Sequence, residues 1–366
     1  MNMKKLVIIQ TVSPSYRNKL YHDLSIRLKD DFHLYSGDTY FEDSVKSDVS
    51  FAKRKKITNL FFLKRRLLIQ LGLGSIVTSN NVLVLEMNPR IISNWIILLI
   101  RNLLRRKTVL WGHAWPREGK KSSSDRIRGL MRSLGNEIIV YTKTQQIELQ
   151  EKMPNKTIHA ACNSLMKIDE MVTNDSDHQT IENIIYVGRL TDRKKPLLLI
   201  KSFHLILERL PKKVKLLIVG EGPEKLRIDQ YINQHNLQLR IKTFGHLDDY
   251  DTLKKLYFSS LFSVSPGYVG LSVTQSFGFG VPMLVSKNEN HSPEIEAVEK
   301  GKNAVFFKTD DTESLGKEMV KMYTMKDFWR NQRSSIVGNC KSQYSIESMS
   351  DVFINIYKNI LNSKFE

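Results

Sequence analysis

The sequence predicts an α/β protein built from two Rossmann-like, doubly wound domains. The first observation is length, because a chain of 366 residues is long enough for two domains of ordinary size. The second is an alternation of short apolar runs with segments of helical spacing, which is typical of parallel sheets covered by helices. The third is a polar stretch, TNDSDHQT, that separates two such series.

These two series set the expected domain boundaries. Residues 1–165 form the N-terminal domain, residues 166–182 the linker and residues 183–340 the C-terminal domain. Residues 341–366 hold a final helix.

The N-terminal domain opens with a strand, a loop and a helix, as expected of a doubly wound domain whose ligands bind at the carboxyl ends of its strands. Short apolar runs between polar residues predict strands over Lys4–Gln10, His33–Ser36, Asn81–Glu86, Thr108–His113, Asn136–Tyr141 and Thr157–Ala160. Helical spacing predicts helices over Asn18–Leu28, Ile91–Leu104, Asp125–Leu134 and Thr142–Lys152.

The segment Phe51–Gln70 mixes basic residues with aromatic and aliphatic ones. Two interpretations stay open. One is an amphipathic element at a membrane surface, and the other is a basic helix packed on the sheet.

The C-terminal domain repeats the same pattern. Its expected strands are Asn183–Val187, Val214–Gly220, Ile241–Phe244, Leu261–Val264, Met283–Val285 and Asn303–Phe307. Its expected helices are Pro196–Leu210, Asp251–Ser259, a segment after Ser272, Thr312–Thr324 and Ile346–Leu361.

Positive charge is concentrated in the N-terminal domain. The net charge is +18, and residues 1–165 hold 28 basic against 13 acidic residues. Between residues 51 and 132 the counts are 18 and 3. Such asymmetry indicates a polyanionic partner, either nucleic acid or an anionic membrane face.

Apolar stretches and cysteines indicate the cellular compartment. The longest apolar stretch, Ile91–Leu104, is shorter than the ~20 residues of a spanning helix, and Leu6–Ile9 is too short for a signal peptide core. The two cysteines, Cys162 and Cys340, form neither a disulfide framework nor a zinc site. We therefore expect a cytoplasmic protein, placed peripherally on the inner face of the cell membrane by its basic domain.

A glycine-bearing loop lies between two apolar runs in the segment Ser265–Glu294. The chain turns at Pro266 and Gly267, passes Gly270 and enters a short helical segment. A loop that feeds a helix N-terminus presents free N–H groups and suits phosphate. A plain α/β turn, with glycines for close packing, is the alternative.

A second candidate phosphate site follows the strand Asn183–Val187. Arg189 comes next after Gly188, and Lys194 lies five residues further on. Arginine forms bidentate contacts with phosphate, and lysine acts as a point charge. The alternative is an ordinary basic loop.

Taken together, these motifs resemble those of retaining glycosyltransferases of the GT-B fold, family four (glycosyl transferases group 1). The family patterns are G-R-L-x-x-x-K, V-G-x-G-P and E-G-F-G-L-x-x-L-E-A-x-A-x-G-x-P with a later P-E pair. The matching residues here are Gly188, Arg189, Leu190, Lys194, Gly220, Gly222, Pro223, Gly270, Leu271, Gly280, Pro282, Pro293 and Glu294. Gly267 and Gln275 stand where the family has two glutamates.

The resemblance implies two domains facing a cleft, a final helix that packs back on the N-terminal domain, and a role for each matched residue. The catalytic residues would be His113, Arg189 and Lys194. Donor-binding residues would be Gly188, Gly222, Phe244, His246, Gly270, Leu271, Ser272, Gln275 and Glu294. Two acceptor-binding candidates come from the chain itself and not from the resemblance. Arg17, in a loop where the family often has glycines, would contact the acceptor or a phosphate, and Trp115, beside His113, would form a sugar-stacking surface. A surface arginine and a core tryptophan are the alternatives. A structural histidine is the alternative for His113.

The implied activity is transfer of a sugar from a nucleotide-sugar donor to a glycan or lipid-linked glycan, in bacterial surface polysaccharide (O-antigen or capsule, lipopolysaccharide) biosynthesis. Retention of configuration and independence from metal are expected, with no cofactor, because Arg189 and Lys194 would supply the positive charge. Two Asp-x-Asp patterns lie at Asp175–Asp177, in the polar linker, and Asp249–Asp251, where helix capping is the simpler role.

The expected partners are therefore the donor, the acceptor and an anionic inner membrane surface, without nucleic acid. Alternatives are a basic nucleic-acid- or membrane-binding protein and a non-catalytic glycosyltransferase-like partner subunit. A nucleotide-sugar epimerase of the same fold is a weaker option.

Overall fold

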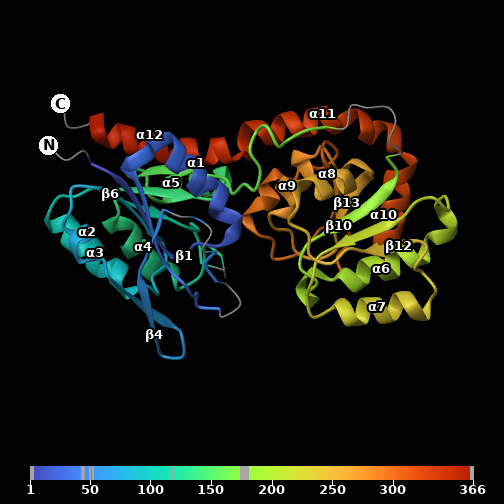
Figure 1. Ribbon diagram of the computed structural model, residues 1–366, viewed down its shortest axis with the longest axis horizontal. Coiled ribbons are helices and arrows are strands. Elements are labelled where there is room, and N and C mark those ends of the chain that lie inside the picture. Colours follow the sequence, from blue (N-terminus) through green and yellow to red (C-terminus); the bar gives the residue numbers. More distant parts are fainter. Residues whose placement is uncertain are drawn as a thin grey trace. The chain divides into compact units, whose positions relative to one another are not determined.

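The computed structural model describes residues 4–42, 46–48, 51, 53–116, 119–173 and 181–362. The chain forms two compact units (Figure 1). Unit 1 comprises Met1–Leu165 and Ile346–Glu366, and unit 2 comprises Met166–Ser345. Each unit is an α/β structure around a parallel sheet, so the predicted fold class of two Rossmann-like domains is confirmed.

The sheet of unit 1 has seven strands in the order β3-β2-β1-β6-β7-β8-β9, and every neighbouring pair is parallel. The order runs outwards in both directions from β1, which is typical of a doubly wound domain. The strands are β1 (Leu6–Val12), β2 (Phe32–Gly37), β3 (Arg54–Lys56), β6 (Val82–Glu86), β7 (Thr108–Trp111), β8 (Glu137–Val140) and β9 (Thr157–Ala160).

Helices cover both faces of this sheet. Leu6 and Ile8 of β1 pack with α1 and α12 on one face. Val7 and Ile9 pack with α3, α4 and α5 on the other. All seven residues of β1 are buried, which explains why it reads as a continuous apolar run. The helices are α1 (Asn18–Leu28), α2 (Gly74–Val77), α3 (Ile92–Leu103), α4 (Asp125–Leu134), α5 (Lys143–Lys152) and α12 (Ile346–Asn362), with 3-10 turns η1 (Ser15–Arg17) and η2 (Lys29–Asp31).

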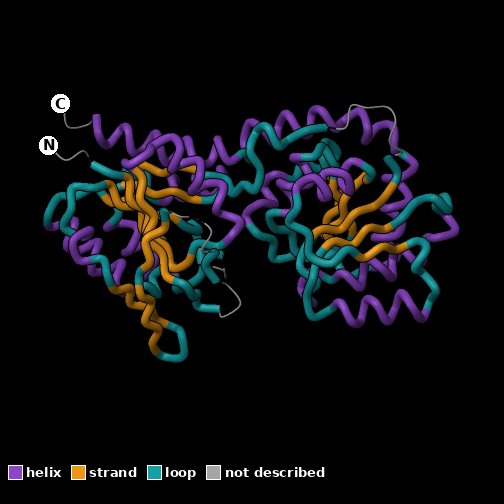
Figure 2. The backbone as a smooth tube through the Cα atoms, in the orientation of Figure 1, coloured by secondary structure: helices purple, strands orange, loops and turns teal. Residues whose placement is uncertain are grey.

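The interpretation of Phe51–Gln70 as a basic helix packed on the sheet is wrong, whereas its interpretation as a membrane-surface element stays a prediction. After β3, the chain forms an antiparallel hairpin of β4 (Thr58–Phe62) and β5 (Leu67–Leu71), visible as the paired orange strands that extend from unit 1 (Figure 2). The physical reason lies in the spacing of its buried residues. Leu68 and Gln70 are buried and their neighbours are not, a period of two that belongs to a strand.

Unit 2 contains a six-stranded sheet in the order β12-β11-β10-β13-β14-β15, again parallel throughout. Its strands are β10 (Asn183–Val187), β11 (Leu216–Val219), β12 (Ile241–Thr243), β13 (Ser260–Ser265), β14 (Met283–Ser286) and β15 (Ala304–Phe307). Its helices are α6 (Pro196–Leu205), α7 (Lys225–Gln234), α8 (Tyr250–Phe258), α9 (Ser272–Gly278), α10 (Thr312–Thr324) and α11 (Lys326–Gln343), with 3-10 turns η3 (Asp192–Lys194), η4 (Leu207–Arg209) and η5 (Pro293–Ala297).

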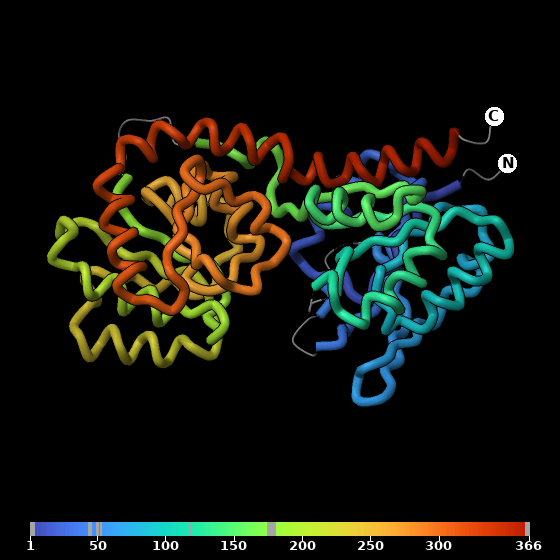
Figure 3. The backbone as a smooth tube through the Cα atoms, turned by 180° about the vertical axis from the view of Figure 1, so that it is seen from behind, coloured from blue at the N-terminus to red at the C-terminus, as the bar shows by residue number. Residues whose placement is uncertain are grey.

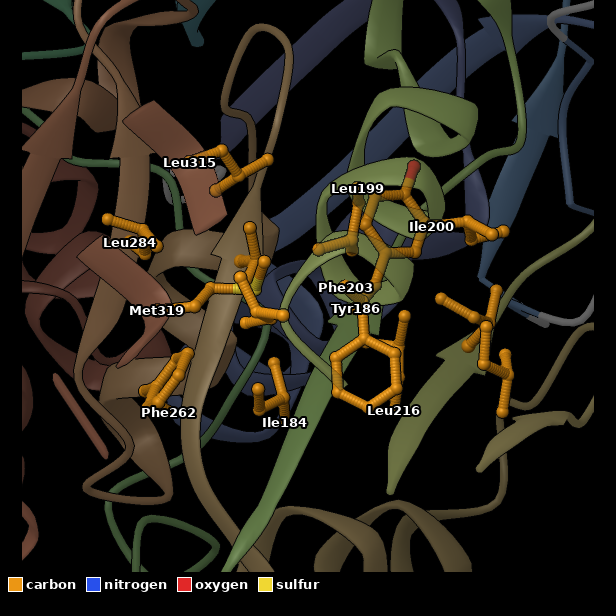
Figure 4. Packing of buried hydrophobic residues seen from close by; sticks show 14 of the residues in the cluster. Ile184, Tyr186, Leu199, Ile200, Phe203, Leu216, Phe262, Leu284, Leu315 and Met319 are labelled. Atoms are coloured by element: carbon orange, nitrogen blue, oxygen red, sulfur yellow. The ribbon is translucent and has the colours of Figure 1, made fainter. Parts of the chain in front are cut away.

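One face of this sheet carries a large apolar core. Leu199 and Phe203 of α6 and Leu315 and Met319 of α10 point towards sheet residues such as Ile184 (Figure 4). All five side chains are fully buried. The core fixes the strand ends, and the loops that leave those ends carry the candidate site.

The chain passes from unit 1 to unit 2 after Leu165 and returns at Ile346. Residues 166–173, which we expected in the linker, pack within unit 2, where Met166 and Met171 are buried beside Gly278. Residues 174–180 of the expected linker, including Asp175–Asp177, lie outside the described residues, and Glu182 at its end is buried. The last helix, α12, drawn in red in Figure 3, packs against α1 of unit 1.

Candidate functional site

Two neighbouring loops meet at the carboxyl edge of the unit 2 sheet. The N–H of Leu190, after β10, donates to the Glu221 carbonyl, after β11, over 2.8 Å. A Cβ on Gly220 would lie 1.9 Å from the Gly188 carbonyl oxygen, and one on Gly222 2.3 Å from that of Leu190. Their φ angles are 146° and 154°, which side chains disfavour. The glycines therefore allow the two loops to touch.

Lys194 is a buried cation at the end of the first loop. Only 9% of it is exposed, and its Nζ donates to the Tyr268 carbonyl over 2.8 Å, 3.8 Å from the centre of the Tyr268 ring. Burial and the positive charge of Arg189 lower the pKa of Lys194 to about 8, and the negative charge of Glu294 opposes this shift. The ammonium is thus charged at neutral pH but poorly neutralised by the protein.

Arg189 lies beside Lys194 on the solvent side. It is exposed, and its backbone carbonyl accepts the Tyr186 hydroxyl over 2.9 Å. The lowered pKa of Lys194 reports the proximity of the two positive charges. Like charges held together indicate a site for an anion.

The glycine loop of the segment Ser265–Glu294 passes directly over this cation. A Cβ on Gly270 would lie 3.6 Å from the Lys194 Nζ. At Gly267 a Cβ would lie 2.3 Å from the Arg193 carbonyl oxygen and 2.8 Å from the Lys194 carbonyl carbon. A side chain at position 267, where the family has a glutamate, would therefore meet the backbone of the Lys194 loop.

His291, which the sequence analysis missed, fixes the glycine loop. The Val269 N–H donates to His291 Nδ1 over 3.0 Å, and His291 Nε2 is 3.0 Å from the Ser286 carbonyl. Nδ1 is an acceptor, so the proton lies on Nε2, which donates to Ser286. Burial lowers the pKa of His291, so the ring is neutral at pH 7. No motif contains this histidine, and its role appears only when the loop and strand are brought together.

The remaining expected donor-binding residues of the segment line the same loop and helix. Leu271 is the N-cap residue of α9 and Ser272 is its first residue. Gln275, one turn later, accepts the Tyr257 hydroxyl at Oε1 over 3.4 Å. Glu294 is buried in η5, with its charge near Lys194.

Phe244 and His246 lie beyond the carboxyl end of the edge strand β12, and both are exposed. Between them, the Gly245 carbonyl accepts the Gly220 N–H over 2.7 Å. This bond connects their loop to the Gly220–Gly222 loop at the same sheet edge. The structure thus brings the expected donor-binding residues of unit 2 onto adjoining loops.

In unit 1, the structure brings Arg17 and His113 to one aromatic group. Arg17 is buried, donates to Gln10 Oε1 over 3.2 Å and to the Tyr141 hydroxyl over 2.8 Å, and stacks 4.1 Å from the centre of the Trp111 ring. The surface-arginine alternative is therefore wrong. His113 lies 4.7 Å from Tyr141, between ring centres.

His113 is exposed, yet desolvation by the surrounding protein and the positive charges of Arg128 and Arg17 lower its pKa. The imidazole is neutral at pH 7. It can therefore accept a proton from, or share a hydrogen bond with, a hydroxyl group.

Trp115 faces another direction. Its Nε1 donates to Glu148 Oε2 of α5 over 2.7 Å, and Lys152 Nζ lies 5.3 Å from its ring centre. Trp115, Lys120, Glu148, Glu151 and Lys152 line a separate hollow. Among the contacts of the described residues, Trp115 shares none with Arg17 or His113.

Metal-binding side chains do not gather in the described part of the chain, where groups of three or more His, Cys, Asp or Glu residues are absent. Asp249 caps α8, accepting the Thr252 N–H over 2.8 Å, so the predicted capping role is confirmed. Among the residues that the structure describes, none of the helices is long and apolar enough to cross a bilayer.

Comparison with known families gives this geometry a context. Residues 174–341, a little under half of the chain, match one family model. The match is to the glycosyl transferases group 1. The matched segment contains Arg189, Lys194, the glycine loop and Glu294.

Two relatives are named glycosyltransferases. The chain is 27% identical to the uncharacterized glycosyltransferase MJ1607 of Methanocaldococcus jannaschii, over 48% of this chain and 44% of that protein. It is 26% identical to the uncharacterized glycosyltransferase MJ1059 of the same organism, over 43% of this chain and 36% of that protein. The match thus spans less than half the length of either relative.

Solved structures extend the likeness of fold to both units. The Anabaena protein Alr3699/HepE in complex with UDP has a TM-score of 0.71 at 15% identity, covering 98% of this chain and 100% of that one. A glycosyltransferase from Rickettsia africae has a TM-score of 0.72 at 13% identity, covering 99% of each chain. The fold is that of GT-B glycosyltransferases.

Proposed function

We propose that this protein is a glycosyltransferase that moves a sugar from a nucleotide-sugar donor to a glycan or lipid-linked glycan. The observation that carries the proposal is the Lys194 ammonium, buried 3.6 Å from the Cβ position of Gly270 and next to Arg189 and Glu294, within the segment that matches glycosyl transferases group 1. Such a cation pair under a glycine loop suits a diphosphate.

The chemistry follows from where charge develops. Breaking the bond between the sugar and the diphosphate leaves a nucleoside diphosphate with added negative charge. Fixed cations at the leaving oxygen stabilise the transition state more than the ground state. Lys194 is held in place by the Tyr268 carbonyl, and Arg189 is exposed and free to add bidentate contacts.

We further propose a metal-independent, retaining reaction of the family four type. Arg189 and Lys194 supply the positive charge that a metal ion supplies elsewhere. Gln275 would hydrogen-bond the ribose, and Glu294 would be the carboxylate closest to the sugar, because a side chain at Gly267 has no space. Retention rests on the resemblance of the motifs.

Unit 1 would bind the acceptor. The neutral His113 and the Arg17 guanidinium are held at the carboxyl edge of the unit 1 sheet, around Tyr141. The high positive charge of residues 51–132 supports an acceptor at an anionic surface. A role in surface polysaccharide biosynthesis, at the inner face of the membrane, is consistent with such an acceptor.

The first experiment is a thermal-shift screen of nucleoside diphosphates and nucleotide-sugars. Solved structures with this fold hold UDP and UDP-glucose, so these are the first compounds to test. Binding raises the melting temperature by mass action. A screen in which no nucleotide raises it would contradict the proposal.

Transfer or hydrolysis of the selected donor then separates an enzyme from a non-catalytic relative. Arg189→Ala and Lys194→Ala should each lose activity. Arg209→Ala and Lys302→Ala, at exposed positions of the same unit, are the matched controls and should retain it.

A further inference from the structure

Helix α3 of unit 1 is apolar on its outer face as well as on its inner face. Ile96 is 51% exposed, Leu99 57% and Leu103 84%. Ile100 and Leu104 are exposed beside them. A surface helix of a soluble protein normally places polar residues outward. A contiguous apolar surface of this kind marks an interaction site.

The outer face is not the result of a loosely attached helix. On the inner face, Ile97 and Leu98 are buried in the sheet core. Near the C-terminal end, Arg101 donates to the carbonyls of Val77, Ser79, Asn81 and Lys107. The helix is therefore fixed, and its outer residues are presented to the surroundings in a defined orientation.

Helix α4 extends this surface. The two helices cover the same face of the sheet, and the Asn102 side chain of α3 donates to the Leu134 carbonyl of α4 over 2.7 Å. Ile127 is 57% exposed and Leu130 60%. We call these residues the α3–α4 surface: Ile96, Leu99, Ile100, Leu103, Leu104, Ile127 and Leu130.

Basic residues adjoin this apolar surface. Arg105 and Lys107, just after α3, and Arg126, on α4, are all exposed. The sequence from Met87 to Pro116 contains no Asp or Glu. An apolar surface with a basic edge is the composition of elements that lie in the interface of an anionic bilayer.

The charge also decides between occupants. A second copy of the chain packed on the same surface would bring two basic edges together, and the sequence from Met87 to Pro116 supplies no acidic partner. Nucleic acid would match the charge but would leave seven aliphatic side chains without an apolar partner. An anionic lipid surface satisfies both parts of the composition.

We propose that unit 1 docks on an anionic lipid bilayer through the α3–α4 surface, with Leu99 and Leu103 inserted among the lipids and Arg105 and Arg126 at the headgroups. This deepens the membrane part of the proposed function, on which it rests, and it does not require transfer activity. It names a surface different from the β4–β5 hairpin within Phe51–Gln70.

Vesicle flotation of the full chain tests the proposal. Wild-type protein should float with vesicles of phosphatidylcholine and phosphatidylglycerol at low salt, and should be released by high salt. Leu99→Ser with Leu103→Ser should lower the partition coefficient by at least about tenfold. Arg105→Gln and Arg126→Gln should each lower it about fivefold.

The matched control is Leu226→Ser with Leu239→Ser in unit 2, where the side chains are equally exposed, at 68% and 81%. It should float like wild type. Flotation of the Leu99 and Leu103 variant at wild-type level would overturn the proposal. Wild type that binds vesicles of phosphatidylcholine alone as well as it binds the anionic vesicles would also overturn it. So would a wild type that does not float but forms dimers, if the Leu99 and Leu103 variant abolishes those dimers.

UDP binding, measured on the same variants, separates the two proposals. It should be unchanged in every α3–α4 variant. Absence of UDP binding by wild type that floats would contradict the donor proposal and leave the docking result intact. Absence of flotation by wild type that binds UDP would contradict only the docking surface.

Discussion

The six-stranded sheet of unit 2 repeats the order of the first six strands of the unit 1 sheet, yet the carboxyl edges of the two sheets are built differently. In unit 2, Gly220 and Gly222 let two loops touch, and Gly267 and Gly270 bring bare backbone against Lys194. In unit 1, the basic residue is Arg17, enclosed by the rings of Trp111 and Tyr141. The first arrangement admits an anion between backbone and cation. The second arrangement holds the Arg17 guanidinium rigidly among aromatic side chains, which suits the positioning of a bound acceptor by side chains.

The largest expected effect restores the family glutamate in unit 2. In Gly267→Glu, the new Cβ would lie 2.3 Å from the Arg193 carbonyl oxygen, so the Lys194 loop must move. We expect UDP affinity, measured by calorimetry, to fall at least about a hundredfold, since displaced charge-assisted contacts are worth ~1.5–3 kcal/mol each. Gly338→Ala, at a helical glycine with open space around it, is the control. Unchanged UDP affinity in Gly267→Glu would show that the close approach of Gly267 to the Lys194 loop does not affect UDP binding.

The next effect should appear only in unit 1. Arg17→Met removes hydrogen bonds to Gln10 and Tyr141 and the stacking on Trp111, while keeping an apolar stem. We expect transfer to the acceptor to be lost, stability to fall by ~1–3 kcal/mol, and UDP affinity to stay as in wild type. Denaturant unfolding and calorimetry measure these quantities. A change in UDP affinity in this variant would contradict the assignment of the acceptor to unit 1 and of UDP to unit 2 alone.

His291→Ala should weaken the unit 2 loop without removing a charge. The Val269 N–H loses its acceptor, which costs ~1–3 kcal/mol, so UDP affinity should fall about tenfold. The pH dependence of the free energy of unfolding gives a second test of His291. Because the pKa of His291 lies below its ordinary value of 6.5, its stabilising contribution is present above pH 6.5 and declines as the pH falls below that value. Wild-type stability should therefore drop more steeply below pH 6.5 than that of the variant.

The smallest effect concerns the protonation of Lys194. With a pKa of about 8, the ammonium is mostly charged at pH 7 and mostly neutral at pH 9. UDP affinity of wild type should therefore fall by up to about tenfold between these values. Lys194→Arg keeps its charge and should bind UDP with little change over the same range. Parallel pH profiles for the two proteins would indicate that another group titrates.

These contrasts also explain what could be predicted from sequence. The strands of both sheets could be predicted, with the exception of β3, because fully buried parallel strands are short apolar runs, as in β1. Strand β3 is basic and largely exposed, so it lacks that signal. The motif of Arg189 and Lys194 could also be predicted, because its residues are close together in the chain. The β4–β5 hairpin could not, since its basic residues obscured the period of two. Helix α11 was also missed, because its apolar residues are sparse among charged ones.

Contacts between segments that are distant in the chain could not be predicted from the sequence. Gly267 stands where the family has a glutamate, and the close approach of the Lys194 backbone to this position is visible only in the structure. His291 joins two loops that are separated by strand β14 and lies in no motif. The outer face of α3 was hidden for another reason. Its pattern predicts a partly buried helix, and only the structure shows which of its apolar residues are exposed.

The most direct test of the central claim compares UDP with uridine by titration calorimetry at pH 7, in wild type and in Lys194→Ala. If the cation pair holds the diphosphate, wild type binds UDP far more tightly than uridine, and the variant loses most of that difference while its uridine affinity is unchanged. An equal preference for UDP in both proteins would contradict the claim.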